Sequence, residues 1–551
     1  MAVSSPGVSG PYPQSTKGKR TLAQWGIIAA GCMCIVGIIF VGIRIASDLS
    51  GVHNSSAWPF ALLALALIIA LGFEFVNGFH DTANAVATVI YTHSLEPHFA
   101  VLWSGTWNFI GVLLSSGGVA YTIITLLPVE LILQVGYGAG FAMVFSLLIA
   151  AILWNLGTWW LGLPASSSHT MIGSIIGVGL ANQYLAKDST HTSGVDWPQV
   201  ANVFKVLLVS PIVGFVFSAL LLLLMKYLIR DPALYEAPKG EAPPPFWIRC
   251  MLVLTCTGVS FGHGSNDGQK GMGLIMLILI GTVPTAYALN HAVGSDQLPD
   301  FVASSNQAIS VMSHARVSNG DTEDPSPQPV NPVQGDTNGK EGGEVERFIS
   351  DRKVSPATPI AVSDLMGKIL KEVVEYKALK DVPSNQQRNV RNDMYLASEA
   401  LRVMQKIKNP RFSATDQQAL DSYRGHLDTA TKFIPTWVKV AVALALGMGT
   451  MVGWKKIVVT VGEKIGKTHL TYAQGMAAEI IAASTIIMAD QFKMPVSTTH
   501  VLSSGVAGTM AANKSGLQWD TLRNIAMAWV LTLPAAGLLS GILFTVFRHF
   551  F

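Results

Sequence analysis

Charged residues are scarce in this sequence. Asp, Glu, Lys and Arg make up 13% of its 551 residues, whereas an ordinary soluble protein carries roughly 25%. Hydrophobic residues account for 50%. This balance excludes an ordinary water-soluble globular protein, so we expect an integral membrane protein built from apolar helices.

Cysteine is also rare, with four in the whole chain. Cys32, Cys34, Cys250 and Cys256 fall inside apolar segments, where cysteine behaves as a small hydrophobic residue. Neither pair has a set of zinc ligands within reach. We therefore predict no disulfide, no structural metal and no cofactor. The net charge of +3 gives no reason to expect a nucleic-acid partner.

Long apolar runs are abundant. A helix needs about 20 apolar residues to cross a bilayer. Runs near this length lie at 25–46, 59–79, 99–120, 138–160, 201–229, 247–266, 435–453, 472–490 and 521–548. Shorter or more polar runs lie at 81–92, 165–182, 271–286 and 496–512. Together they predict an all-α polytopic membrane protein with roughly ten to twelve transmembrane helices plus re-entrant pieces.

The first apolar run, 25–46, follows a polar N-terminal tail, residues 1–24, which contains the basic cluster KGKR. This run is longer than the ~7–15 residues of a signal-peptide core. We therefore interpret it as a retained, extra N-terminal transmembrane helix.

One long polar loop, 291–432, separates a first membrane part, 55–290, from a C-terminal membrane part, 433–551. Its first portion, 319–344, is rich in Pro, Gly and Asp and is predicted to be disordered. Its second portion is predicted to be helical, because apolar residues recur there at helical spacing. The three apolar stripes are Val362, Leu365, Met366, Ile369, Leu370 and Val373; Met394, Ala397, Leu401 and Met404; and Leu420, Tyr423 and Leu427. About half of all Lys and Arg residues lie in this loop, which favours the cytoplasmic side, although long loops weigh little in that rule.

Two polar motifs occur twice, in the same order. Pro164–His169 and Pro495–His500 share the pattern Pro-x-Ser-[Ser/Thr]-[Ser/Thr]-His. The segments 77–88 and 262–273 each contain glycine and a polar cluster centred on an aspartate, Asp81 and Asp267 respectively. Repeats with polar interruptions at corresponding places in membrane segments indicate a secondary transporter.

The two aspartates require a functional explanation. A carboxylate near the bilayer centre costs at least ~2.5–3.5 kcal/mol. Asp81 and Asp267 stand in Gly/Asn-rich sequence that we expect to be unwound, and unwound backbone is tolerated at membrane depth only inside protein or beside a wet cavity. Each aspartate should therefore line a cavity.

The Pro-Ser motifs predict the beginnings of two half-helices. Proline suits the first helical turn, Ser and Thr suit the cap, and the free N–H groups of a helix N-terminus attract anions. The hydroxyls add further donors without a fixed charge, as a reversible site for a multivalent oxyanion requires. The predicted anion-binding residues are Ser166, Ser167, Ser168, Thr170, Ser497, Thr498 and Thr499, beside Asp81 and Asp267.

An anion such as phosphate, with a charge of ~−1.5 to −2, would be repelled by two aspartates at low dielectric. Cations must therefore enter with it. Sodium, protons or a divalent metal held by Asp81, Asp267, Asn84 and Asn266 would lower the repulsion, and each ligand would then favour binding of the other. This reciprocity is the physical basis of symport.

These four motifs resemble the inorganic phosphate transporter (PiT) family. GFHDTANAVATVIYT and SFGHGSNDGQKGMGLIMLILIG look like its duplicated Gly-x-Asn-Asp signature, and LPASSSHT and MPVSTTH look like its paired re-entrant hairpins. The resemblance covers about 55–290 and 433–551 and is strongest to bacterial low-affinity members. It implies two inverted repeats with broken helices, enclosing phosphate and coupling cations near the midplane.

The resemblance also implies uptake of phosphate by alternating access across the bacterial inner membrane, with protons and as a neutral metal–phosphate complex, by a homodimer that is not an enzyme. Asp81, Asn84, Asn266 and Asp267 match signature positions, and Glu479 matches an acidic position before the second hairpin. No particular metal is implied.

Two residues depart from the family pattern. His80 stands where the signature has its first Asn, and Asn108 stands where sodium-coupled relatives carry Glu. These changes remove sodium ligands or add a titrating group. We therefore include His80 and Asn108 among the coupling-cation residues and favour protons over sodium. A sodium-coupled phosphate symporter and a permease for another oxyanion such as sulfate remain the alternatives.

Several neighbouring residues allow two interpretations. His169 and His500 could face the anion or bond a neighbouring helix, Lys270 could neutralise phosphate or pair with Asp267, and Glu74 could join the cation site or not. An intramembrane hydrolase with a serine nucleophile and a histidine base is a rival from another class. Against it, adjacent Ser and His side chains point in different directions, and no separate carboxylate is spaced to orient the base.

Overall fold

The computed structural model describes residues 17–50, 58–127, 131–132, 138–185, 195–238, 240, 242–315, 340–407 and 410–550. Within these ranges the side chains of 17–27, 58–59, 82–84, 138–139 and 340–342 are not described. The candidate Asn84 side chain and most of the segment predicted to be disordered therefore lie outside the described residues.

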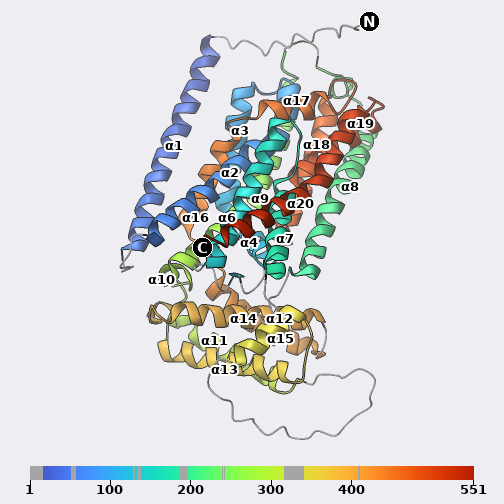
Figure 1. The fold of residues 1–551 in the computed structure, drawn as a ribbon. Helices are drawn as coiled ribbons and strands as arrows, with labels where there is room; N and C mark the ends of the chain where they lie inside the picture. Colours follow the sequence, from blue (N-terminus) through green and yellow to red (C-terminus); the bar gives the residue numbers. More distant parts are fainter. Residues whose placement is uncertain are drawn as a thin grey trace.

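The described residues are helical and contain no strand, which confirms the prediction of an all-α membrane protein (Figure 1). The α-helices of the membrane part are α1 (Lys17–Leu49), α2 (Trp58–Tyr91), α3 (Pro97–Leu114), α4 (Gly118–Ile124), α6 (Gly138–Trp160), α7 (Ser167–Leu185), α8 (Trp197–Leu228), α9 (Phe246–Thr282), α10 (Pro284–Tyr287), α16 (Thr436–Thr450), α17 (Lys455–Glu463), α18 (Tyr472–Gln491), α19 (Thr498–Ala512) and α20 (Trp519–Phe547). All four cysteines are free.

By length and apolarity, six of the described helices qualify as membrane spans, and up to eight spans result if each bent helix pair counts as one. One such pair is α3 and α4, with a bend of 77°. The six are α1, α2, α6, α8, α18 and α20. The expected ten to twelve crossings also counted shorter or more polar pieces, such as α9 with its Ser-Asn-Asp-Gly-Gln-Lys cluster.

The two halves of the bundle pack in corresponding ways. Helix α2 packs on α16 as α9 packs on α3, and α7 packs on α20 as α19 packs on α8. Gly78 and Gly264 mark equivalent points of close approach, because a Cβ atom there would lie 2.2 Å from the Leu446 carbonyl oxygen and 2.1 Å from the Asn108 carbonyl oxygen, respectively. The repeat seen in the motifs thus extends to backbone packing.

The course of α2 and α9 differs from the sequence prediction. Unwound segments were expected at Asp81 and Asp267, but both residues lie inside uninterrupted helices of 34 and 37 residues. The breaks lie in the Pro-Ser motifs, between α6 and α7 and between α18 and α19. Glycine lets neighbouring backbones approach without freeing backbone hydrogen-bonding groups, which would be costly in a membrane.

The polar loop forms a helical domain at one end of the bundle, which we call the insert (Figure 1). Its helices are α11 (Leu298–Ser313), α12 (Lys340–Asp351), α13 (Ala357–Tyr376), α14 (Gln387–Ile407) and α15 (Ala414–Thr431). The three predicted stripes lie in α13, α14 and α15, and all their residues except the partly buried Leu370 are buried in one core. The helical prediction for this portion is confirmed. From α15 the chain turns by 72° into α16.

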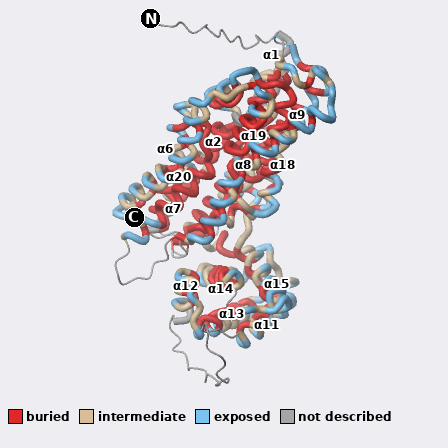
Figure 2. Tube along the Cα trace, turned by 90° about the vertical axis from the view of Figure 1, so that its right-hand side faces the viewer, coloured by how far each residue is buried: buried red, intermediate tan, exposed pale blue. Residues whose placement is uncertain are grey.

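Burial is distributed as expected for a membrane protein. Figure 2 shows buried residues through the middle of the bundle and a separate buried centre in the insert. Large apolar side chains are exposed along α1, α8 and α20, among them Ile35, Leu208 and Val530. Exposed apolar surface on this scale is costly in water but favourable against lipid.

Candidate substrate site

Two helices begin at the same place inside the bundle. Ser166 caps α7 by accepting a bond from the His169 N–H at 3.3 Å, and Ser497 caps α19 by accepting one from the His500 N–H at 3.1 Å. From there α7 and α19 run towards opposite ends of the bundle (Figure 1). Two positive helix ends thus meet at one buried point.

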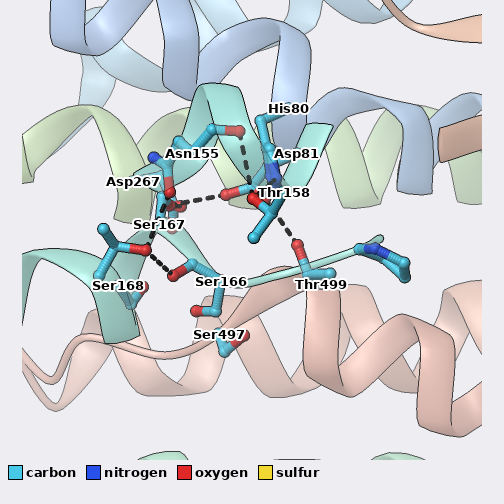
Figure 3. Close-up of polar contacts among 12 residues, drawn as sticks. His80, Asp81, Asn155, Thr158, Ser166, Ser167, Ser168, Asp267, Ser497 and Thr499 are labelled. Carbon is cyan, nitrogen blue, oxygen red and sulfur yellow. Dashed lines mark hydrogen bonds and ion pairs between the residues drawn. The ribbon is translucent and has the colours of Figure 1, made fainter. Parts of the chain in front are cut away.

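Asp81, on α2, receives hydroxyl donors from both of these helices. Ser167 Oγ donates to one carboxylate oxygen at 2.7 Å, and Thr499 Oγ1 donates to the other at 2.7 Å (Figure 3). His80 Nδ1 lies 3.1 Å from Asp81 Oδ1, and its Nε2 lies 3.1 Å from Thr158 Oγ1. Asp81 therefore joins the two half-helices.

Asp267, on α9, has a different set of partners. Lys270 Nζ lies 2.6 Å from Asp267 Oδ2 and donates to Ser168 Oγ at 2.5 Å. His263 Nε2 lies 3.6 Å from the same carboxylate oxygen, and Ser167 Oγ donates to it at 3.2 Å. Ser167 thus bridges the two aspartates. Lys270 pairs with Asp267, as one of its two interpretations predicted, and it also reaches the first hairpin through Ser168.

Backbone atoms of the second hairpin also bind the site. Asn266 donates through Nδ2 to the Met494 carbonyl at 3.1 Å and accepts from the Val496 N–H at 3.3 Å. Ser168 Oγ donates to the Val496 carbonyl at 2.8 Å. The tip of the second hairpin is therefore held by α9 and by the first hairpin together.

The candidate hydroxyl groups differ in the hydrogen bonds that they already make. Ser166 and Ser497 are used as caps, and Thr170 Oγ1 bonds Asn155 Oδ1 and the Ser166 carbonyl, each at 2.9 Å. Ser167 and Thr499 point at Asp81, while Thr498 Oγ1 is buried without a hydrogen-bond partner. The hydroxyls best placed to bind an anion are thus those of Ser167, Thr498 and Thr499.

Two candidate cation residues lie outside this contact group. Asn108 bonds His263 Nδ1 at 2.8 Å and Thr450 Oγ1 at 3.1 Å, and His263 in turn lies beside Asp267. Glu479, on α18, accepts bonds from Thr88 and from Thr255, the latter at 2.5 Å. Its described contacts include neither aspartate. Glu479 is nevertheless fully buried. Glu74, which precedes Asp81 on α2, is also fully buried.

The rings of the two motif histidines are in contact, tilted by 38° to one another. The centroids of His169 and His500 are 4.3 Å apart, and His500 stacks on Trp529 of α20 at 4.0 Å. Both rings are buried, and the hairpin hydroxyls bond carboxylates, carbonyls and Lys270 rather than these imidazoles. This arrangement offers no serine–histidine pair for hydrolysis.

Three side chains could hold a metal or other cation. Ligand atoms of Asp81, His263 and Asp267 all lie within 4.8 Å of one another, and all three residues are buried. The second oxygen of Asp267 and His263 Nε2 have no hydrogen-bond partner. Two carboxylates and an imidazole suit protons or a divalent transition metal.

His263 is not among the site residues predicted from the sequence, yet the structure places it between Asn108 and Asp267. The available signal was its position four residues before Asp267, which puts both side chains on one face of a helix. Trp529 was not singled out at all, because nothing in the local sequence of α20 indicates that it packs on a residue of α19.

Comparison with known proteins places these features in context. Residues 77–540 match the phosphate transporter family. The chain is 44% identical over 510 residues to the "Low-affinity inorganic phosphate transporter PitA" of Escherichia coli (strain K12), covering 89% of this chain and 97% of that protein. It is 26% identical over 491 residues to the "Probable low-affinity inorganic phosphate transporter" of Bacillus subtilis (strain 168), covering 89% and 98%. A solved structure titled "The sodium-dependent phosphate transporter" is 18% identical, with a TM-score of 0.46 and coverage of 89% and 100%.

Proposed function

Because the chain belongs to the phosphate transporter family, we propose that it carries inorganic phosphate across the membrane together with protons, by alternating access. The family membership confirms the resemblance found in the sequence. The homologues are named as transporters, so the hydrolase interpretation is dropped.

One observation carries the proposal: two helix N-termini from the two repeats, with Ser167 and Thr499, meet at Asp81. The hydroxyls that donate to Asp81 can turn to donate to phosphate oxygens instead, and Thr498 adds a hydroxyl that is not yet used. Lys270 supplies one fixed positive charge beside them. A site of this kind replaces the hydration of an oxyanion without holding it irreversibly.

Protons are the cations that these side chains favour. His80 and His263 lie against Asp81 and Asp267, and an imidazole changes its charge near neutral pH. A proton on either pair removes one negative charge facing the phosphate. At low dielectric this change is large compared with the same change in water.

Two further buried carboxyl groups, Glu74 on α2 and Glu479 against it, lie at a distance from Asp81. Glu74 lies seven residues before Asp81, and Glu479 bonds Thr88, seven residues after it. At 1.5 Å per residue these points lie about 10 Å to either side of Asp81. Glu74 and Glu479 would therefore give protons an acceptor on each side of the site.

A divalent metal is compatible with the same geometry. A metal held by Asp81, His263 and Asp267 would reach the hydroxyls around Asp81 and could enter with phosphate as a neutral complex. In that case the metal is cargo, and its binding would compete with protonation of the same three groups.

Proteoliposome uptake of labelled phosphate, with proton, sodium and magnesium gradients imposed one at a time, tests the proposal. We expect uptake to follow the proton gradient, to collapse with a protonophore and to persist without sodium. Strict sodium dependence would overturn the coupling assignment. Complete competition by excess sulfate would favour the alternative of a broader oxyanion permease.

A further inference from the structure

A cavity of about 730 Å³ lies where the insert meets the bundle. The insert contributes residues of α14 and α15, and the bundle contributes the bend between α3 and α4, the start of α8 and the end of α18. In Figure 1 this is the end of the bundle at which α4 lies above α14. All the lining residues belong to the described part of the chain.

The charge of this lining is mostly positive. Its charged residues are Arg402, Lys406, Arg424, Lys432, Lys493, Glu399 and Asp428, five cations against two acids. Hydroxyl and amide groups of Ser116, Tyr121, Thr122, Thr125, Thr429, Gln199 and Gln405 complete the wall. Such a wall suits an oxyanion.

Three of the cations are already paired. Arg402 bonds Glu399 at 2.6 Å, Lys432 bonds Asp428 at 2.7 Å, and Arg424 bonds Asp421 at 3.0 Å. The remaining two, Lys406 and Lys493, have no ion pair among the described residues. Within the described part of the chain, Lys406 donates to Gln199 Oε1, at 3.3 Å.

Partial burial and the neighbouring Arg402 and Arg352 lower the pKa of Lys406, against the opposing influence of Asp196 and Glu399. Lys406 is thus partly withdrawn from water, with charges of both signs around it. An anion beside it would stabilise its charged form.

The cavity is connected to the substrate site by a short piece of chain. Lys493 lines the cavity, Met494 and Val496 bond Asn266, and Thr499 bonds Asp81. From Lys493 to Thr499 the chain spans at most about 21 Å. A polar layer adjoins this piece of chain: Asp490 accepts bonds from Ser265 at 2.7 Å and from Gln269 at 2.6 Å, and Gln269 accepts one from the Val119 N–H at 2.9 Å.

We propose that this cavity is a second, weaker phosphate site, a vestibule in which the insert and the second hairpin hold the transported anion at the insert-side mouth of the pathway. The proposal rests on the proposed function. The cations raise the local concentration of phosphate next to the layer of Asp490 and Gln269, and opening of that layer joins vestibule and site. The insert therefore takes part in transport.

The double variant Lys406→Gln/Lys493→Gln tests this role in the full-length protein. Phosphate uptake is measured in inside-out and in right-side-out membrane vesicles. We expect the KM for phosphate to rise about three- to tenfold in one orientation, the one that exposes the insert, with kcat unchanged, because exposed charge interactions contribute little individually. The matched control, Lys380→Gln/Lys464→Gln, removes the same charge elsewhere and should leave both values unchanged.

Salt and nucleotide provide further readouts. The insert-side KM of the wild type should rise with ionic strength, and that of the double variant should not. An unchanged KM in both orientations, or an equal rise in both, would overturn the vestibule. The vestibule would also be overturned if a binding assay showed that ATP binds at the insert face and phosphate does not, because the cavity would then bind another phosphate-bearing solute. Absence of phosphate uptake by the wild type would instead refute the proposed function.

Discussion

Asp81 and Asp267 occupy corresponding places in the two repeats, yet their surroundings differ. Asp81 is bonded by two hydroxyls, one from each half-helix, and contacts His80. Asp267 is paired with Lys270, which also bonds Ser168. The two repeats place the two aspartates in similar backbone surroundings, but the side chains around them differ. Asp81 is bonded by hydroxyl groups, which are neutral and can rotate, whereas Asp267 is paired with the cation of Lys270. We infer that Asp81 responds to the substrate, whereas Asp267 organises the site.

The largest expected effect comes from neutralising either aspartate. Asp81→Asn and Asp267→Asn should each lower phosphate uptake at least about 100-fold, the order expected when a coupling free energy near 3 kcal/mol is lost. Uptake per inserted protein in proteoliposomes measures the effect. Normal uptake by either variant would show that this aspartate does not bind the coupling cation, and would refute the contrast drawn between Asp81 and Asp267.

Lys270 tests whether the Asp267 side is organised by its ion pair. Lys270→Gln leaves a buried carboxylate without its cation and should destabilise the protein by about 3–5 kcal/mol. The double variant Asp267→Asn/Lys270→Gln should regain much of that stability without regaining transport. Thermal unfolding in detergent measures stability. If the double variant is no more stable than Lys270→Gln, the ion pair between Asp267 and Lys270 does not stabilise this part of the structure.

Ser167 tests the bridge between the two aspartates. Because hydrogen bonds to charged groups contribute about 1.5–3 kcal/mol, Ser167→Ala should raise the KM for phosphate roughly 10- to 100-fold. Ser174→Ala is the matched control, since this hydroxyl of the same helix donates only to the Thr170 carbonyl. Equal KM values for the two variants would contradict a binding role for Ser167.

The smallest effect is expected at His80. His80→Gln keeps a hydrogen-bonding group beside Asp81 but removes an imidazole that can carry a proton, so uptake should fall no more than about tenfold while its pH dependence flattens. The pH profile of initial uptake rates between pH 5 and 8 measures this. A profile identical to that of the wild type would show that His80 is not the proton carrier and would shift attention to His263.

The sequence predicted the helix starts of the two hairpins well because their signals are local. A proline followed by three hydroxyl residues marks a helix start whatever surrounds it, and α7 and α19 indeed begin at Ser167 and Thr498. The helices of the insert were predicted for the same reason, since the stripes of α13, α14 and α15 need only a common core.

Residue roles that depend on distant partners could not be predicted. Nothing in the sequence tells that Lys270 reaches Ser168, that Asn266 holds the backbone of Met494 and Val496, or that Glu479 lies against Thr88. The predicted unwinding at Asp81 and Asp267 was wrong for a related reason. Glycine-rich polar sequence has weak helix propensity, but tertiary packing of α2 and α9 kept both helices intact.

By itself, then, the sequence determined that the chain is helical, enters a membrane, carries two related halves and buries two carboxylates beside hydroxyl-rich helix starts. Tertiary structure alone decided which hydroxyls act as caps and which face the carboxylates, and that one aspartate acquired a lysine while the other acquired hydroxyls. The physical reason is that membrane burial and the helix starts at the Pro-Ser motifs follow from each segment's own composition. The charge balance at a buried point is instead the sum over side chains that only folding brings together.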